Sequence, residues 1–217
     1  MSRALEPQLR AGLQTLDLAL DEAQIAALLD YVDLIQKWTR VYNLTAVRDP
    51  QDMLTHHLLD SLAVVRPLRQ QLAALGRDES VRVLDVGAGA GLPGVVLAIC
   101  CPTMTVHCVD TVAKKAAFVQ QAAVSLKLPR LRGIHARVES LTEPYDVVCS
   151  RAFASLADFT QWSVGALAPE GVWMAMKGKH PQAELLALDP GVQVFHVEPL
   201  QVPGLDAERC LVWMRRA

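Results

Sequence analysis

Glycines are concentrated in residues 85–94, which read Asp-Val-Gly-Ala-Gly-Ala-Gly-Leu-Pro-Gly and follow a short apolar run. Glycine lets the backbone turn sharply and lets a ligand approach without a Cβ in the way. A tight turn without a ligand is the alternative, but four glycines within eight residues disfavour it. The dinucleotide fingerprint GxGxxG would need a glycine where Leu92 stands, and no GK[ST] of a phosphate-binding loop follows. The segment therefore predicts a ligand-binding loop of another kind.

An acidic residue, Asp110, ends the next apolar run along the chain. A carboxylate at this place can accept hydrogen bonds from both ribose hydroxyls of a nucleoside, and each charge-assisted bond contributes about 1.5–3 kcal/mol. NAD-binding proteins carry an acid at the same place, so Asp110 indicates a ligand that contains a nucleoside but does not show which one. Capping of a helix beside Lys114 and Lys115 is the alternative role.

Basic side chains follow two further apolar runs. The fork of donors on Arg151 suits a phosphate, a carboxylate or the edge of a guanine, and an ion pair with a nearby acid is the alternative. Lys177 and Lys179 follow the next run. With Arg151 and Arg137 they could form a cationic mouth that contacts phosphates, or they could be ordinary solvated side chains.

Two histidines and an aspartate lie within one helical turn nearer the N-terminus. Although that spacing brings side chains together, the adjacent His56 and His57 point in different directions, so we expect no metal site. His57 or Asp60 could line a substrate pocket, with helix packing as the alternative. Asn43, with Tyr42, could contact the substrate or simply end a helix.

These residues are predicted to lie on alternating strands and helices. Apolar runs over residues 81–86, 105–109, 131–136, 146–150 and 171–176 are separated by segments with helical spacing, such as 114–126 and 156–167. This alternation indicates βαβ units and a parallel sheet buried on both faces, whose ligands bind at the carboxyl ends of the strands. Runs 193–197 and 210–214 predict an antiparallel hairpin at the sheet edge.

The first 75 residues are predicted to be helical. A capping box from Asp21 to Gln24 begins a helix that Asn43 ends. Asp49-Pro50 begins the next helix, which Pro67 is expected to break. We expect two parts, an N-terminal helical extension over residues 1–75 and a Rossmann-like α/β domain over residues 76–217.

Composition is that of an ordinary compact protein of 217 residues with a net charge of −2. No apolar run approaches the ~20 residues of a membrane span, and residues 1–10 hold no signal-peptide core. The five cysteines form no CxxC pair. We therefore expect a cytoplasmic protein that does not associate with a membrane and binds no metal ion. The charge disfavours a general nucleic-acid coat but allows a local basic patch.

Several motifs together resemble a known family. The chain reads W-x3-YNLT at 38–45, H-x2-DS at 57–61, the glycine loop, RVE at 137–139, SRAFA at 150–154 and KG at 177–178. This order is similar to bacterial small-subunit (16S) ribosomal RNA guanine-N7 methyltransferases, the glucose-inhibited division protein B family. Thr39 departs from the asparagine expected after Trp38. The loop alone resembles motif I of class I methyltransferases.

The resemblance implies a class I methyltransferase fold that uses S-adenosylmethionine. Cofactor contacts carry over to Gly87, Leu92, Val138, Glu139 and Arg151. Gly89 and Asp110 complete the predicted cofactor set. Arg151 is also the catalytic candidate, and the substrate candidates are Asn43, His57, Lys177 and Lys179. The implied substrate is a guanine of 16S ribosomal RNA, within the small ribosomal subunit.

Guanine N7 carries a lone pair and no proton, so it needs no general base, and the sequence offers no convincing acid–base dyad. Alignment and removal of water are then the main tasks of the enzyme. The [DN]PP[YF] motif of amino-methylating enzymes is absent, and Cys149 is expected in a strand core rather than as a nucleophile. Three alternatives are a methyltransferase acting on a small molecule or protein, an NAD-dependent oxidoreductase, and a ribosome-binding protein without catalysis.

Overall fold

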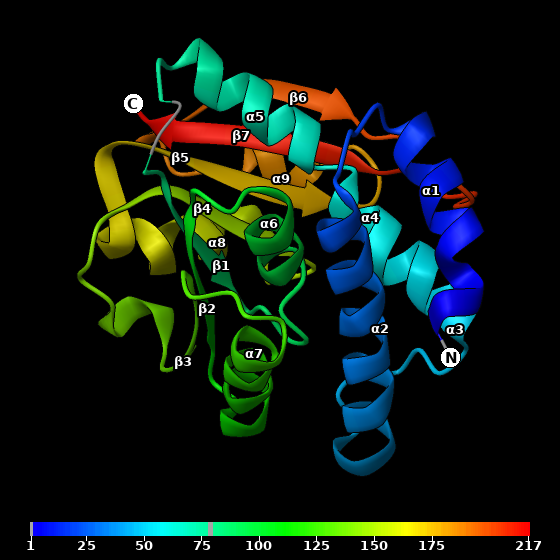
Figure 1. Ribbon diagram of the computed structural model, residues 1–217. Helices are drawn as coiled ribbons and strands as arrows, with labels where there is room; N and C mark the ends of the chain where they lie inside the picture. The colour runs from blue at the N-terminus through cyan, green and yellow to red at the C-terminus, as the bar shows by residue number, and fades with distance from the viewer. Residues whose placement is uncertain (1, 78–79) are drawn as a thin grey trace.

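A computed structural model describes residues 2–77 and 80–217, and its described residues are organised around a seven-stranded sheet (Figure 1). The strands are β1 (Arg82–Val86), β2 (Thr105–Asp110), β3 (Leu131–His135), β4 (Tyr145–Arg151), β5 (Leu167–Lys177), β6 (Val192–Pro199) and β7 (Cys210–Arg216). Their order across the sheet is β3-β2-β1-β4-β5-β7-β6. Strands β1 to β5 are parallel, and β7 runs antiparallel to both β5 and β6.

The predicted fold class is confirmed, including the antiparallel hairpin at one edge. Its last strand, β7, lies inside the sheet, and β6 is the edge strand. The predicted strand runs match the observed strands closely, because apolar runs of this kind suit a sheet that is buried on both faces. β5 begins earlier than predicted, since Leu167 pairs with Tyr145 ahead of an irregularity in the register.

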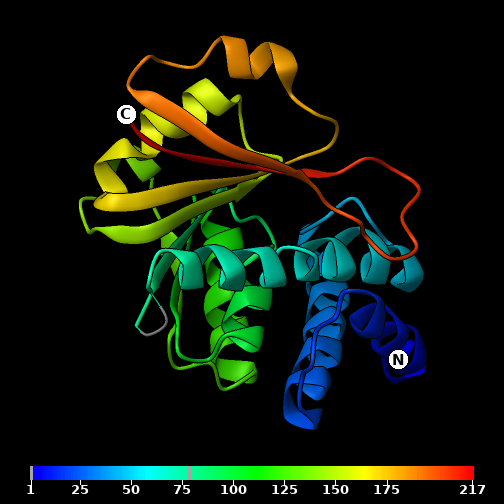
Figure 2. The same cartoon turned by 90° about the horizontal axis from the view of Figure 1, so that it is seen from above.

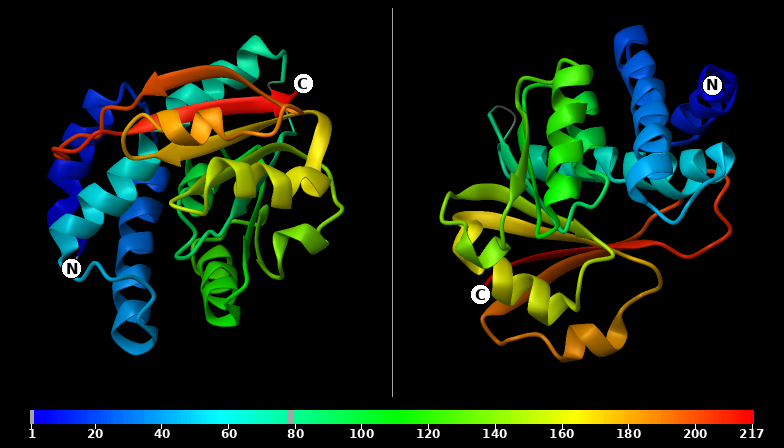
Figure 3. Two further views of the ribbon diagram at one scale, coloured as in Figure 1. Left: turned by 180° about the vertical axis from the view of Figure 1, so that it is seen from behind. Right: turned by 90° about the horizontal axis from the view of Figure 1, so that it is seen from below.

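Helices cover both faces of the sheet, as Figures 2 and 3 show. One face carries α6 (Gly94–Cys100) and α7 (Ala113–Ser125), and the other carries α8 (Leu156–Ser163) and α9 (Gln182–Leu186). Neighbouring strand residues divide between the two apolar clusters, with Val147 in one and Val148 in the other. This division follows from the alternation of side chains along a strand. Short 3-10 turns are η1 (Ser2–Leu5), η3 (Val138–Ser140) and η4 (Val164–Ala166).

The N-terminal residues are helical, as predicted: α1 (Glu6–Thr15), α2 (Glu22–Tyr42), α3 (Pro50–Met53), the π-helical η2 (Leu54–Leu59), α4 (Asp60–Leu62) and α5 (Val65–Ala74). The capping box forms, because Gln24 N donates to Asp21 Oδ1 at 2.7 Å and Asp21 N donates to Gln24 Oε1 at 3.0 Å. Asn43 ends α2 with a left-handed φ of 51°. The helix break predicted at Pro67 lies slightly earlier, because α4 ends at Leu62 and a turn at Ala63 and Val64 precedes α5. Pro67 lies in the first turn of α5, where its missing N–H costs no hydrogen bond.

These N-terminal helices share an apolar cluster with α6 and α7 on one face of the sheet. Gln24 Nε2 donates to Ile99 O at 2.9 Å, and the Tyr31 hydroxyl donates to Ala90 O in the glycine loop. These hydrogen bonds connect the helical extension to the end of α6 and to the glycine loop. Across the described residues, no helix is both long enough and apolar enough to cross a bilayer.

Candidate active site

The glycine loop after β1 adopts a backbone that only glycine takes easily. Gly87, Gly89 and Gly91 all have positive φ angles, of 66°, 59° and 81°. A Cβ on Gly87 would collide with the ring of Phe153, whereas one on Gly89 would meet no side chain within 4 Å. Gly87 and Ala88 donate to Val109 O at the end of β2. The loop is thus fixed to the sheet, and its outer side is open to a ligand.

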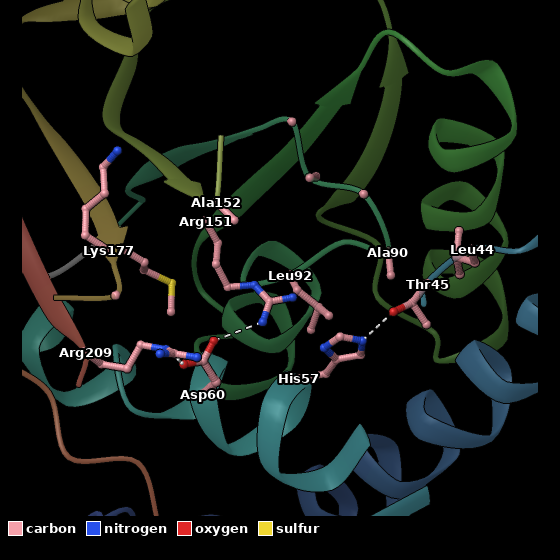
Figure 4. A pocket seen from close by; sticks show the side chains of 15 residues that line it. Leu44, Thr45, His57, Asp60, Ala90, Leu92, Arg151, Ala152, Lys177 and Arg209 are labelled. Carbon is pink, nitrogen blue, oxygen red and sulfur yellow. Dashed lines mark hydrogen bonds and ion pairs between the residues drawn. The ribbon is translucent and has the colours of Figure 1, made fainter. Parts of the chain in front are cut away.

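Two cavities meet at this loop, at the carboxyl ends of the parallel strands. One, of about 400 Å³, lies between β1, β2 and the turn after β3. The other, of about 450 Å³, lies between the loop, η2, the end of β4 and the end of β5. Gly87 and Ala152 line both cavities, so a single elongated ligand could occupy both. Figure 4 shows the side chains of the larger cavity.

Asp110 lines the smaller cavity as an almost buried carboxylate, 8 % exposed. Its Oδ2 accepts from Gly89 N at 3.0 Å, and its Oδ1 accepts from Val112 N at 2.8 Å. Lys115 Nζ lies 3.8 Å from Oδ2. Asp110 therefore supports the glycine loop and the start of α7 while it faces the cavity. The N-cap of α7 is Val112, without a side-chain cap bond, so Asp110 is not the helix cap considered as its alternative role.

The other end of the smaller cavity is lined by the segment after β3. Val138 is buried and Glu139 is exposed, and both line the cavity. The guanidinium of Arg137 donates to Glu139 Oε1 at 2.7 Å and lowers the pKa of that carboxyl. Glu139 thus partly neutralises the charge of Arg137. Of the four residues proposed for the cationic mouth, Arg151 and Lys177 line the larger cavity, and Arg137 and Lys179 do not.

A buried carboxylate, Asp60, joins two arginines in the larger cavity (Figure 4). Arg151 Nη1 donates to Asp60 Oδ2 at 2.9 Å and to His56 O at 2.8 Å. Arg209 Nε donates to Asp60 Oδ1 at 2.8 Å. Asp60 is 2 % exposed. The ion pair considered for Arg151 therefore exists, and Arg151 still lines the cavity.

Arg209 is a site residue that the sequence did not single out. It lies in the loop before β7, far along the chain from the cavity's other residues, and no motif surrounds it. The antiparallel pairing of Lys177 with Cys210 and the ion pair with Asp60 bring Arg209 to the cavity in the folded chain.

His57 lies beside this cluster and is held by Thr45. The distance from His57 Nε2 to Thr45 Oγ1 is 2.7 Å. Burial, followed by the charge of Arg151, lowers the pKa of His57 to about 4. His57 is therefore neutral near pH 7. Its Nδ1 is buried and has no hydrogen-bond partner among the described residues.

The three remaining substrate candidates are placed differently. Lys177 lines the larger cavity, but its Nζ donates to Glu184 Oε2 at 2.7 Å and to Ala154 O at 3.1 Å, and Figure 4 shows it turned away from Asp60. Lys179 is exposed and lies outside the lining. Asn43 is exposed at the end of α2, and its Oδ1 accepts from Arg48 Nη2 at 2.7 Å.

Asp85 is a buried acid directly beneath the glycine loop. Its Oδ2 accepts from Gly94 N at 2.8 Å, while its Oδ1 has no partner among the described residues. Burial raises the pKa of Asp85 to about 7. Cys149 is fully buried in β4, as predicted. Within residues 2–77 and 80–217, no cluster of histidine, cysteine, aspartate and glutamate could hold a metal ion.

The chemistry available in the larger cavity is alignment rather than proton abstraction. Both oxygens of Asp60 are bonded to arginines, and His57 is bonded to Thr45. The cavity therefore presents fixed hydrogen-bond donors and cationic groups. Such a site suits a nucleophile that already has a free lone pair.

Comparison with known proteins gives both family and fold matches. The family model described as "GidB: rRNA small subunit methyltransferase G" matches residues 24–212. "Ribosomal RNA small subunit methyltransferase G" of a Polaromonas species is 68% identical over 213 residues, which cover 98% of this chain and 94% of that protein. The protein of the same name from Acidovorax ebreus is 65% identical over 216 residues, covering 98% and 96%.

Solved structures share the fold at low sequence identity. The magnesium protoporphyrin IX methyltransferase of Synechocystis, with bound SAM, has a TM-score of 0.60 at 16% identity and covers 92% of this chain and 99% of that one. A SAM-dependent methyltransferase of Aquifex aeolicus has a TM-score of 0.55 at 16% identity, covering 73% and 93%. At this identity the two matches show a shared fold.

Proposed function

This chain belongs to the rRNA small subunit methyltransferase G family, and on that premise we propose that it transfers a methyl group from S-adenosylmethionine to N7 of a guanine in 16S ribosomal RNA. Family membership over nearly the whole chain supports the substrate class and sets aside the NAD-dependent, non-catalytic and small-molecule alternatives. The single observation that supports methylation at N7 comes from the larger cavity. Its carboxylate and its histidine are both already engaged in hydrogen bonds, and N7 needs no general base.

The residues around the two joined cavities fit S-adenosylmethionine. Asp110 is a fixed carboxylate facing the smaller cavity, where it would bind the ribose, and Val138 and Glu139 would flank the adenine. Gly87, Gly89 and Leu92 would contact the part of the ligand that crosses into the larger cavity, because all three line it. When bound, the cofactor supplies a sulfonium methyl group.

Arg151 is the side chain that we propose acts on the reacting groups. Asp60 and the His56 carbonyl hold its guanidinium in place before any ligand binds. A group fixed in advance loses little conformational entropy on binding. Arg151 is therefore preorganised to orient an anionic part of the cofactor or the guanine edge, and correct alignment is a large rate effect.

We propose His57 as a neutral contact to the guanine. His57 lines the larger cavity, and because its Nε2 is bonded to Thr45 and its Nδ1 is buried, the uncharged ring itself would pack against the base. Asn43 and Lys179 are exposed and could contact RNA outside the cavity, while Lys177 would first have to leave Glu184. We further propose that the RNA is recognised within the small ribosomal subunit, and hence in the cytoplasm.

The test uses small subunits from cells that lack this protein. Incubation with the purified protein and tritiated S-adenosylmethionine should label one guanine of 16S ribosomal RNA, located by mass mapping of nucleotides. A label in ribosomal protein, or at a guanine atom other than N7, would contradict the proposal. The Arg151→Ala protein is the control, and it should remain folded but transfer no methyl group.

A further inference from the structure

The C-terminal end of α2 and the loop after it, residues 37–48, form a surface that we call the α2 tip. It contains the basic residues Lys37, Arg40 and Arg48 and no acidic residue, although the whole chain has a net charge of −2. The first part of the same helix contains acidic side chains, among them Glu22 and Asp30. Charge is therefore separated along α2, and the positive end is the tip.

The tip also exposes apolar and aromatic surface. Val41 is 69 % exposed and Tyr42 is 46 % exposed, although both are large side chains. The ring of Tyr42 packs against Trp38, with the ring centroids 5.0 Å apart. Tyr42 is thus held on one side by a partly buried tryptophan and remains open on the other. Lys37 and Arg40 are also exposed on this last part of α2.

The position of the tip relates it to the larger cavity. Leu44 and Thr45, within the tip, line that cavity, and Thr45 holds His57. In Figures 1 and 2 the light-blue end of α2 projects beyond the neighbouring helices. A polymer with one residue in the cavity would therefore have part of the tip, Leu44 and Thr45, next to that residue.

The common role of basic residues at a helix end does not account for this cluster. Cations near a helix C-terminus interact favourably with the helix dipole, but only within its last turn. Lys37 lies more than one turn before the end of α2, and Arg48 lies beyond the helix. Arg48 instead donates to Asn43 Oδ1, a neutral acceptor, and so keeps its positive charge at the tip.

We propose that the α2 tip binds a single-stranded segment of the RNA substrate next to the target base. Lys37, Arg40 and Arg48 contact phosphates, and the open face of Tyr42 stacks on a base. Single-stranded RNA is bound in this way, by cationic side chains along the backbone and aromatic faces against the bases. The inference rests on the proposed function and names the surface that holds the RNA outside the cavity.

The experiment measures binding of a 16S ribosomal RNA transcript and of small subunits lacking the methyl group, over a series of salt concentrations. The tip variant is Lys37→Gln with Arg40→Gln, and the matched control is Lys127→Gln with Arg132→Gln. The control removes two exposed positive charges outside the α2 tip, at Lys127 after α7 and at Arg132 in β3. Circular dichroism checks the fold of each variant, and calorimetry checks its affinity for S-adenosylmethionine.

We expect the tip variant to bind both RNA forms about tenfold more weakly, with the slope of log K against log salt reduced by roughly 1.4 for two lost single-strand contacts. The control should match the wild type, and cofactor affinity should be unchanged in both. Tyr42→Ala should weaken binding by at least about fivefold, while Tyr42→Phe, which keeps the aromatic face, should not.

Equal binding and equal salt slopes in the tip and control variants would overturn the proposal. Loss of affinity for small subunits with normal affinity for the transcript would also overturn it, because the tip would then contact ribosomal protein. Binding does not require methyl transfer, so these outcomes remain decisive even if the wild type methylates no RNA. That last result would reject the proposed function separately.

Discussion

Asp110 shows how one side chain can serve both the fold and the ligand. Its two oxygens accept backbone N–H groups from Gly89 and Val112. A carboxylate oxygen can accept more than one hydrogen bond, so Asp110 can still bind ribose hydroxyls. The residue thereby connects the position of the glycine loop to the binding of the nucleoside.

We predict that Asp110→Ala weakens binding of S-adenosylmethionine by about ten- to a hundredfold, because charge-assisted hydrogen bonds to the ribose are lost. Calorimetry measures the change. Glu170→Ala, which removes an exposed acid on the turn within β5, is the control and should bind normally. Unchanged affinity in Asp110→Ala would remove Asp110 from the cofactor site.

His57 makes stability depend on pH in a defined direction. Its pKa is 6.5 in its ordinary state and about 4 in the folded protein, because it is buried near Arg151. Below the unfolded pKa, the unfolded chain binds a proton that the folded chain disfavours. The free energy of unfolding should therefore fall as the pH drops from about 6.5 to about 4, and be unaffected by His57 above that range.

The check is denaturant unfolding of the wild type and of His57→Gln at several pH values. The variant should lose stability less steeply than the wild type between pH 6.5 and 4. His180→Gln, at an exposed position, is the control and should follow the wild type. Parallel curves for His57→Gln and the wild type would show that His57 titrates normally.

Three elements far apart in the sequence are joined at Asp60. The carboxylate belongs to α4, Arg151 to the end of β4, and Arg209 to the loop before β7. Asp60 follows the π-helical η2, and π-helical turns often occur at functional sites. The ion pairs thus connect the helical extension to the carboxyl ends of the strands, where the site lies.

We predict that Asp60→Asn lowers the free energy of unfolding by about 3 kcal/mol, because two arginines lose a buried carboxylate. The rate of methyl transfer should fall as well, even at temperatures where the variant stays folded. Double-mutant cycles with Arg151→Gln and Arg209→Gln measure the coupling of each pair. A coupling near zero for both pairs would show that the bridge contributes nothing.

At the scale of the whole molecule, the helical extension and the α/β domain depend on one another. Every residue of α6 is buried, and part of its cover comes from α2. We propose that residues 1–75 are an extension of one folding unit with residues 76–217, and not a separate unit.

We predict that residues 76–217 alone do not form a stable fold, since removal of the extension exposes the apolar face of α6 to water. The fragment should aggregate or lack a cooperative thermal transition, as measured by light scattering and circular dichroism. The full chain is the reference. Cooperative unfolding of the isolated fragment would establish two independent units.

The sequence alone determined the features that arise from local pattern. Strand and helix positions follow from the spacing of apolar side chains, and the glycine loop from a backbone that other residues adopt poorly. The fold class was predicted from these patterns, and the family and the cofactor class from the resemblance of the motifs to a known family; all three are confirmed. The roles of the individual cofactor and substrate residues remain predictions.

Tertiary structure decided which charged groups meet. The sequence indicated Arg151 but not its partner, missed Arg209 entirely, and treated Lys177 as available although Glu184 binds it. It also placed a helix break at Pro67, whereas the break lies at Ala63 and Val64 and Pro67 belongs to the first turn of the next helix. Ion pairs between residues distant in the chain leave no periodic signal, because they depend on how the elements pack and not on the neighbours of each residue.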